Sequence, residues 1–287
     1  MGSGLIERAG RILTEQGHNL TVAPTTGPLV AGAIAREHIE RGADLIVVAG
    51  GDGTINEAAE GMLGTDVPLA ILPGGTANVL AMEMKLGGNM ERAAQRLGEL
   101  RPRRISVGHV TCDNGRVSRH FLLMAGIGLD AHVVYKVHPG LKAKTGKFAY
   151  WVAGWSLLGK KLAEFDVEIA GQRRKCSFAL LSKVRNYGGD FEIARSVSLM
   201  DDEFEVVLFE GPTSTSYVKY FAGMALNKLA GMGGVTVVRA DQIRVGACAD
   251  KRAYIQIDGE LVGHLPAELK IVRNALTVLA PEEYGKK

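Results

Sequence analysis

The feature that most limits the fold of this chain is a repeated pattern of an apolar segment, a glycine-rich stretch and a helix-like segment. Residues 45–49 and 69–72 contain no polar side chain, which is typical of strands buried on both faces of a sheet. Gly50 follows the first segment directly, Pro73 and two glycines follow the second, and helices are expected after them, the first at 55–63. This order predicts a parallel, doubly wound α/β sheet.

The chain divides at a short basic stretch, Arg101-Pro102-Arg103-Arg104. Before it, the spacing of apolar residues predicts two further helices and a short strand, at 5–16, 29–40 and 20–23. After it, alternating polar and apolar residues predict mainly strands. We therefore expect an α/β domain at residues 1–102 and a β-rich domain at residues 103–287.

The β-rich part contains candidate strands separated by turn-forming residues. Residues 105–111 and 117–124 flank Asn114-Gly115, a strong signal for a β-hairpin. Further strands are expected at 165–170, 176–181, 204–209, 243–247, 254–257, 267–272 and 276–279. Helices are expected at 148–162 and 217–229. The aromatic stripe of the first is interpreted as a core contact, with a lipid-facing surface as the alternative.

Composition and charge exclude several classes of function. The net charge of +3 is too small to indicate a nucleic-acid partner. The three cysteines are scattered and form no C-x-x-C pair, so we expect neither a disulfide framework nor a cysteine zinc site, and a cytoplasmic protein. The longest apolar stretch, residues 148–159, is too short to span a bilayer. A lipid substrate would therefore be met by transient contact with the membrane surface.

Two basic clusters lie at residues 101–104 and 173–175. They are interpreted as a solvated linker and a hairpin turn, with contact to an acidic membrane as the alternative.

The first glycine-rich stretch is the strongest candidate for a ligand site, and it consists of Gly50, Gly51, Asp52, Gly53 and Thr54. Glycines allow a tight turn and close approach of a ligand, and the following helix offers unpaired amides and the positive end of its dipole. Thr54 and Glu57 have the spacing of a capping box, which predicts where that helix starts. Asp52 would repel a phosphate unless a magnesium ion or a sugar hydroxyl lies between them. Taken alone, the loop fits a plain strand-to-helix turn equally well.

The second stretch, residues 73–78, has the same position relative to the next buried strand. Two neighbouring parallel strands would place both loops at one carboxyl edge of the sheet, where open α/β sheets bind ligands. Together the loops therefore predict a site for a phosphate-bearing ligand. A third stretch, residues 126–131, matches G-x-G-x-x-A, but no βαβ unit surrounds it. It is interpreted as a close packing turn between a strand and a helix rather than a dinucleotide site.

Two acidic motifs in the second half have two interpretations each. Asp258-Gly259-Glu260 is either a β-hairpin turn or the source of a carboxylate that accepts a proton from an attacking hydroxyl. Asp201-Asp202 is either an exposed turn or part of a cation site built with nearby backbone carbonyls.

Several motifs together resemble the diacylglycerol kinase catalytic family, which is related to sphingosine kinases and, more distantly, to NAD kinases. They occur in family order and cover nearly the whole chain, at 50–57, 72–78, 126–130, 187–189, 201–202 and 258–260. The resemblance implies an N-terminal α/β nucleotide-binding domain, starting after the strand with which the family usually opens, and a C-terminal β-sandwich-like domain.

The resemblance also implies roles for particular residues. ATP would be bound by Thr26, Gly50, Gly51, Asp52, Gly53, Thr54, Ile55, Asn56, Gly74, Gly75, Thr76 and Asn78. Asp52 would organise Mg²⁺ and the phosphates, and Asp258 or Glu260 would accept the proton of the lipid hydroxyl. A structural magnesium site would consist of Leu199, Asp202 and Phe204. In this chain Val79, Lys183, Arg195 and Glu203 replace residues that are common in the family.

The implied function is a lipid kinase that transfers the γ-phosphate of ATP to a hydroxyl of a diacylglycerol-like lipid. Its partner would be a lipid substrate reached by peripheral membrane contact, and no nucleic-acid partner is expected. The implied function is compatible with a homodimer. Two alternatives stay open, an NAD kinase-like enzyme and a catalytically inactive regulator that binds nucleotide or lipid.

Overall fold

The computed structural model describes residues 3–128, 162–186, 193–213, 231–250 and 253–285, and single positions at 217, 219, 220, 223, 228 and 229. The chain forms two compact units, each described by itself below. Unit 1 contains Met1–Ser106 and Arg273–Lys287, and unit 2 contains Val107–Val272. The boundary was expected between residues 102 and 103, and it lies between Ser106 and Val107. The division also differs at the end of the chain, because residues 273–287 return to unit 1.

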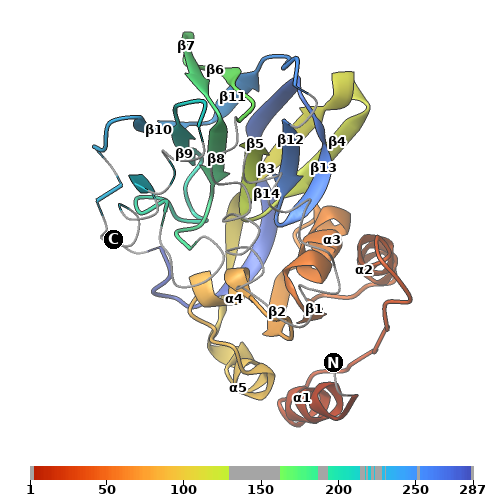
Figure 1. Ribbon diagram of the computed structural model, residues 1–287. Helices are drawn as coiled ribbons and strands as arrows, with labels where there is room; N and C mark the ends of the chain where they lie inside the picture. The colour runs from red at the N-terminus through yellow and green to blue at the C-terminus, as the bar shows by residue number, and fades with distance from the viewer. Residues whose placement is uncertain are drawn as a thin grey trace. The chain divides into compact units, whose positions relative to one another are not determined.

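Unit 1 is an α/β domain, as the apolar segments predict (Figure 1). Its elements are α1 (Ser3–Glu15), α2 (Ala31–Glu40), β1 (Ile46–Gly50), α3 (Asp52–Met62), β2 (Leu69–Pro73), α4 (Val79–Glu83), α5 (Met90–Gln95) and the 3-10 helix η1 (Leu97–Glu99). Strands β1 and β2 pair in parallel, from Ile46 opposite Leu69 to Gly50 opposite Pro73. On its other side β2 pairs in parallel with β14 (Ala267–Ala280), where Val278 lies opposite Leu69.

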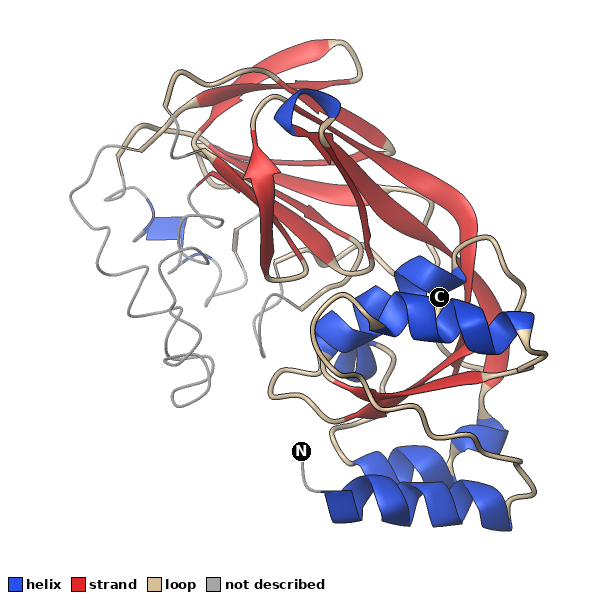
Figure 2. Cartoon of the chain, turned by 90° about the vertical axis from the view of Figure 1, so that its right-hand side faces the viewer, coloured by secondary structure: helices blue, strands red, loops and turns tan. Residues whose placement is uncertain are grey.

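The helices of unit 1 pack in two pairs, α1 against α5 and α2 against α3 (Figure 2). Gly32 and Gly61 permit the second pair to approach closely. A Cβ atom on Gly32 would lie 2.7 Å from the carbonyl oxygen of Glu57 in α3. The backbones of α2 and α3 are therefore in direct contact at this point.

Two predictions for unit 1 are wrong. Residues 20–23 do not form a strand: Val22 is 72% exposed, and no described strand pairs with this segment. The capping box is wrong as well, because α3 begins at Asp52 with Gly51 as its N-cap, which places Thr54 inside the helix. The Glu57 carboxylate instead accepts a hydrogen bond of 3.4 Å from the Ala31 amide, at the start of α2.

Unit 2 is β-rich, and two sheets enclose its core. The six-stranded sheet has the order β10 (Val235–Ala240), β9 (Phe204–Phe209), β8 (Phe178–Ser182), β5 (Met124–Gly128), β12 (Tyr254–Ile257) and β13 (Glu260–His264). In the other sheet, β14 is followed by β11 (Gln242–Val245), β6 (Phe165–Ile169) and β7 (Gln172–Cys176), while β3 (Arg101–Cys112) pairs with β14 and with β4 (Val117–Phe121). Side chains from both sheets form one buried cluster, in which the rings of Phe121 and Phe204 stack at 5.6 Å. The expected sandwich-like domain is confirmed.

The hairpin around Asn114-Gly115 is confirmed, since β3 and β4 are antiparallel and the short 3-10 helix η2 (Asp113–Gly115) joins them. The two strands expected at 267–272 and 276–279 are one continuous strand, β14. Arg101 to Arg104 lie in β3 rather than in a linker.

Gly126 and Gly128 lie in β5, an antiparallel strand between β8 and β12, so no βαβ unit surrounds them. Residues 129–131, residues 148–161 of the predicted helix, residues 187–189 and most of residues 217–229 lie outside the described part of the chain.

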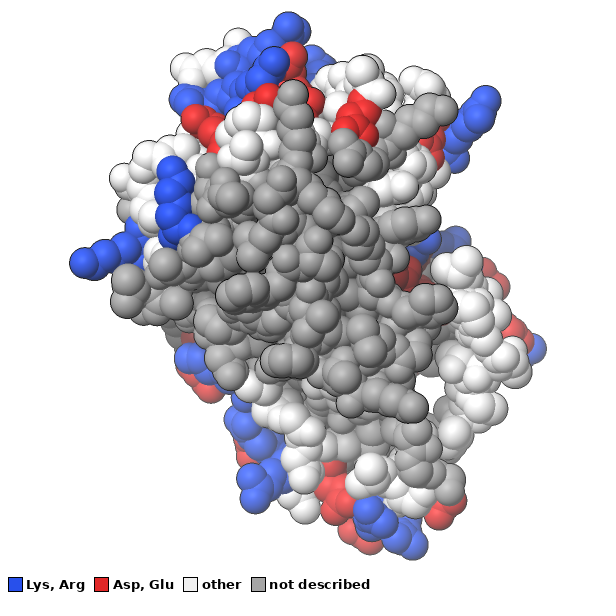
Figure 3. Space-filling model, in the orientation of Figure 1, with Lys and Arg blue, Asp and Glu red and all other residues white. Residues whose placement is uncertain are grey.

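The second basic cluster lies on the β6–β7 hairpin. Arg173 is paired with Glu168 and Lys175 with Asp166 in the register of the two strands. Figure 3 shows basic side chains with acidic ones beside them at the end of unit 2 where Figure 1 places this hairpin. Among the described residues, no helix is long and apolar enough to cross a membrane.

Candidate functional site

The two glycine loops of unit 1 are in direct contact, because each follows one of two paired parallel strands. The Gly74 amide donates a hydrogen bond of 2.9 Å to the carbonyl of Gly50. A Cβ atom on Gly75 would lie 2.6 Å from the Gly51 Cα, a distance that real Cβ contacts do not reach. The predicted meeting of the loops at the carboxyl edge of the sheet is therefore confirmed, and glycine is required where they touch.

Asp52 connects the first loop to the helix that follows the second. Its two carboxylate oxygens each accept a hydrogen bond of 3.1 Å, one from the Val79 amide and one from the Leu80 amide. These are the first two residues of α4, whose amides have no partner within the helix. Asp52 therefore caps α4, which explains an acidic residue in this loop without a metal or a sugar.

Asn78 fixes the shape of the second loop. Its side-chain oxygen accepts a hydrogen bond of 2.7 Å from the Gly75 amide, and its side-chain nitrogen donates one of 2.9 Å to the Gly75 carbonyl. The residue adopts a left-handed conformation with φ of 49°, which asparagine tolerates better than most residues. Both polar atoms of the Asn78 side chain therefore bind the backbone of its own loop.

The surface that the loops present consists mainly of backbone and of the exposed Thr76 hydroxyl. Gly75 and Thr76 are exposed, residues 51–54 are half-buried, and Ile55 and Asn56 are buried. The first amides of α3 point out of the helix start without intrahelical partners, and the helix dipole adds partial positive charge there. Such an arrangement can bind the oxygens of a phosphate.

In unit 2, Asp258-Gly259 forms the turn between β12 and β13, with positive φ at both residues. The hairpin interpretation is therefore confirmed. The Asp258 carboxylate accepts hydrogen bonds from three consecutive amides, those of Leu122, Leu123 and Met124, at 2.8, 2.9 and 2.9 Å. It anchors the β4–β5 connection and has little remaining capacity to accept a proton.

Glu260 has different surroundings from Asp258. Its side chain is 46% exposed, and the Arg119 guanidinium lies 3.9 Å from its carboxylate. No backbone amide holds its carboxylate in the described contacts. Of the two candidate bases, Glu260 has the more exposed side chain.

The expected structural metal site has a lysine in it. Lys183 is fully buried, and its ammonium donates hydrogen bonds to the carbonyls of Leu199, at 3.2 Å, and of Asp201. Burial lowers the pKa of Lys183 to about 8, against the opposing effect of the Asp201 and Asp202 carboxylates. Among the described residues, no cluster of three or more metal-ligating side chains is present. These surroundings do not fit a divalent cation on the Leu199 carbonyl.

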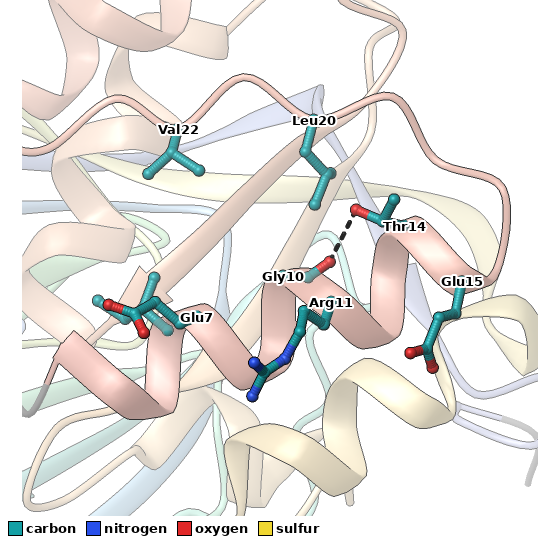
Figure 4. Close-up of a pocket in the computed structure, with 8 residues that line it drawn as sticks. Glu7, Gly10, Arg11, Thr14, Glu15, Leu20 and Val22 are labelled. Atoms are coloured by element: carbon teal, nitrogen blue, oxygen red, sulfur yellow. Dashed lines mark hydrogen bonds between the residues drawn. The ribbon is translucent and has the colours of Figure 1, made fainter.

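Thr26 stays a prediction, because it lies exposed in a segment without regular structure and no described contact joins it to the loops. An open groove of about 650 Å³ lies between α1 and the extended segment after it, lined by Arg11, Thr14, Leu20 and Val22 among others (Figure 4). None of the predicted site residues lines this groove.

Sequence reasoning missed three residues that organise the candidate sites. It treated Lys183 as a departure from a family pattern, and it gave Arg239 and Glu205 no role. Glu205 is buried and accepts hydrogen bonds from the amides of Arg195 and Ser196. The available signal was a charged residue within or directly beside an apolar, strand-like segment, at 183, 205 and 239.

The fold and the paired loops define a two-part protein, with an α/β domain of the phosphate-binding type and a β-sandwich-like domain. Two family models match these parts: "Diacylglycerol kinase catalytic domain" over residues 1–110, and "YegS C-terminal NAD kinase beta sandwich-like domain" over residues 124–280. The chain therefore belongs to the diacylglycerol kinase catalytic family.

Individual relatives agree with this assignment. A diacylglycerol kinase of Mycobacterium tuberculosis is 28% identical over 258 residues, which cover 88% of this chain and 80% of that protein. One of Bacillus subtilis is 27% identical over 282 residues, covering 95% and 89%. A crystal structure of a diacylglycerol kinase from Bacillus anthracis str. Sterne has a TM-score of 0.78 at 22% identity, covering 97% of this chain and 92% of that one. At this identity, the structural match shows that the two chains share a fold.

Proposed function

We propose that this protein transfers the γ-phosphate of ATP to the hydroxyl of a diacylglycerol-like lipid. The observation that carries the proposal is the backbone contact between the two glycine loops at Gly51 and Gly75, in a chain whose two parts match the two domains of a lipid kinase family. The relatives in Mycobacterium tuberculosis and Bacillus subtilis, both named diacylglycerol kinase, support the choice of lipid.

On the donor side, we assign the direct phosphate contacts to the backbone of residues 50–54 and 74–76 and to the Thr76 hydroxyl. Ile55, Asn56 and Asn78 are buried, so they position the loops instead. Magnesium would accompany ATP and neutralise charge on the β- and γ-phosphates. Asp52 acts through α4, because its carboxylate already binds the Val79 and Leu80 amides.

On the acceptor side, we assign the base to Glu260. Its carboxylate takes the proton of the lipid hydroxyl as that oxygen forms a bond to the γ-phosphorus. The bond from this phosphorus to the β–γ bridging oxygen breaks, and ADP leaves with the electron pair. Phosphoryl transfer depends mainly on positioning and charge stabilisation, so the protein needs to supply one general base and an amide-rich site for the phosphates of Mg²⁺-ATP.

The experiment that tests this function is a labelling assay with the purified protein, Mg²⁺ and ATP labelled at the γ-phosphate. Vesicles containing diacylglycerol, a total lipid extract and NAD are offered in separate reactions. We expect label in phosphatidic acid. Label in another lipid would keep the lipid kinase but change its substrate, and label in NADP would identify the NAD kinase alternative. ATP binding without any labelled product would support the inactive regulator.

A further inference from the structure

The turn that carries Asp201 and Asp202 is organised around a lysine of the protein itself. Lys183 follows β8 directly, and its amide donates a hydrogen bond of 2.8 Å to the Leu123 carbonyl, which fixes where its side chain starts. The side chain is completely buried. Its ammonium ends on two carbonyl oxygens of the turn, those of Leu199 and Asp201.

The turn itself is closed by contacts that direct these carbonyls inward. The Asp201 carboxylate accepts a hydrogen bond of 2.9 Å from the Ser198 amide, and the Asp201 amide donates one of 2.9 Å to the Ser198 carbonyl. Leu199 therefore lies at the tip of a compact loop, and its carbonyl faces the Lys183 ammonium at 3.2 Å.

A second cation binds the outer side of the same turn. The Arg239 guanidinium lies 2.9 Å from the Asp201 carboxylate and 3.3 Å from that of Glu203, and it donates a hydrogen bond of 2.7 Å to the Ser196 carbonyl. Two positive side chains thus already face the negative charge of Asp201, Asp202 and Glu203. A magnesium ion needs about six oxygen ligands at roughly 2.0–2.1 Å, and a buried ammonium on one of those oxygens would repel it.

We propose that the Lys183 ammonium replaces a structural divalent cation, so that the turn at residues 196–204 folds without a metal. An ammonium is a compact point charge with three donors, which suits a site made of carbonyl oxygens beside carboxylates. This turn then needs no divalent ion, whatever the nucleotide requires.

The test measures thermal unfolding without nucleotide, in a chelator and in Mg²⁺ or Ca²⁺. For the wild-type protein we expect the same unfolding temperature in all three solutions, and no saturable heat when either ion is titrated in. Lys183→Asn removes the charge, opens space and adds an amide oxygen. This variant should unfold at a lower temperature in chelator and regain roughly 3–6 °C at ten times the dissociation constant of the ion.

Lys270→Asn is the matched control, because Lys270 is exposed on β14, and it should not respond to either ion. Two results would overturn the proposal. One is a wild-type protein stabilised by Mg²⁺ or Ca²⁺ through a site that Asp202→Asn removes. The other is a Lys183→Asn protein whose unfolding temperature ignores both ions. If that variant folds too poorly to study, the wild-type titration and its Asp202→Asn comparison still decide the question, and neither depends on kinase activity.

Discussion

Asp258 and Glu260 are two positions apart, yet the structure gives their carboxylates different surroundings. Three amides surround the first, at residues 122–124, whereas the second is 46% exposed. A general base needs carboxylate lone pairs that structural hydrogen bonds do not already occupy. At the scale of the residue, one carboxylate therefore suits stability and the other suits chemistry.

Glu260→Gln should lower turnover by roughly 10²–10⁴-fold, the usual contribution of a general base, and leave the unfolding temperature unchanged. Asp258→Asn should instead reduce the free energy of unfolding by about 1–3 kcal/mol, because an amide cannot accept from all three backbone donors. Kinetics and thermal unfolding of both variants check the assignment, with Glu268→Gln on β14 as control. A Glu260→Gln enzyme of full activity would contradict it.

The three cysteines also have different local surroundings, because two are buried and one is only partly buried. Burial raises the pKa of Cys112 to about 11 and raises that of Cys176 further, with nearby carboxylates adding to both effects. A raised pKa means that the unreactive thiol form persists at pH 8. Cys248 is only partly buried.

We therefore expect iodoacetamide to modify Cys248 first in the native protein, and the other two cysteines only after unfolding. Mass spectrometry of peptides over a time course at pH 8 measures this order. Equal rates for all three cysteines in native protein would show that the buried pair is accessible.

At the scale of the element, the candidate site depends on two loops held at contact distance. Parallel pairing of β1 and β2 brings Gly50 opposite Pro73, and Asp52 then connects α3 to the start of α4. Neither loop has this arrangement alone. The close contact leaves no room for a side chain at Gly75.

Gly75→Ala should push the loops apart, because its Cβ atom would lie 2.6 Å from the Gly51 Cα. We expect ATP binding to weaken by at least about tenfold, and stability to fall by the 1–3 kcal/mol that is typical of overpacking. Gly88→Ala is the control, since nothing lies within 4 Å of its Cβ position. Calorimetric titration with ATP compares the two variants, and equal affinities would mean that the loop contact is not needed.

At the scale of the whole molecule, the chain order and the compact units do not coincide. Residues 273–287 belong to unit 1 although they are last in the sequence. The second half of β14 supplies a strand beside β2, with Leu276, Val278 and Ala280 fully buried. Arg104 strengthens this return by binding the Asn274 carbonyl at 2.8 Å and the Thr277 hydroxyl at 2.9 Å.

Deleting residues 273–287 should therefore unfold unit 1, which contains the glycine loops at the opposite end of the sequence. The milder change Leu276→Ala should cost about 2–5 kcal/mol, as is usual for a buried leucine. Hydrogen exchange at β1 and β2 measures both effects, and deletion of residues 286–287 is the control. Native-like protection of β2 in the long deletion would contradict the role of β14.

The sequence alone determined the features that arise from local pattern. The apolar segments at 45–49 and 69–72 predicted parallel strands, although only the second is fully buried and β1 is partly exposed. The glycines predicted tight loops, and Asn114-Gly115 predicted a hairpin, because each signal lies within a few neighbouring residues. The two loops could be placed together as well, since the carboxyl ends of paired parallel strands lie at one edge. The family followed from the order of these motifs.

Tertiary structure decided which partners the polar side chains have. Glu57 binds the start of α2 instead of its own helix, Asp52 caps α4 from 27 residues away, and Lys183 binds carbonyls 16 and 18 residues further on. Residues 20–23 have the composition of a strand but no described neighbour to pair with. Hydrogen bonds between residues far apart in the sequence form only where the fold brings those residues together. A local sequence pattern does not show which residues they are.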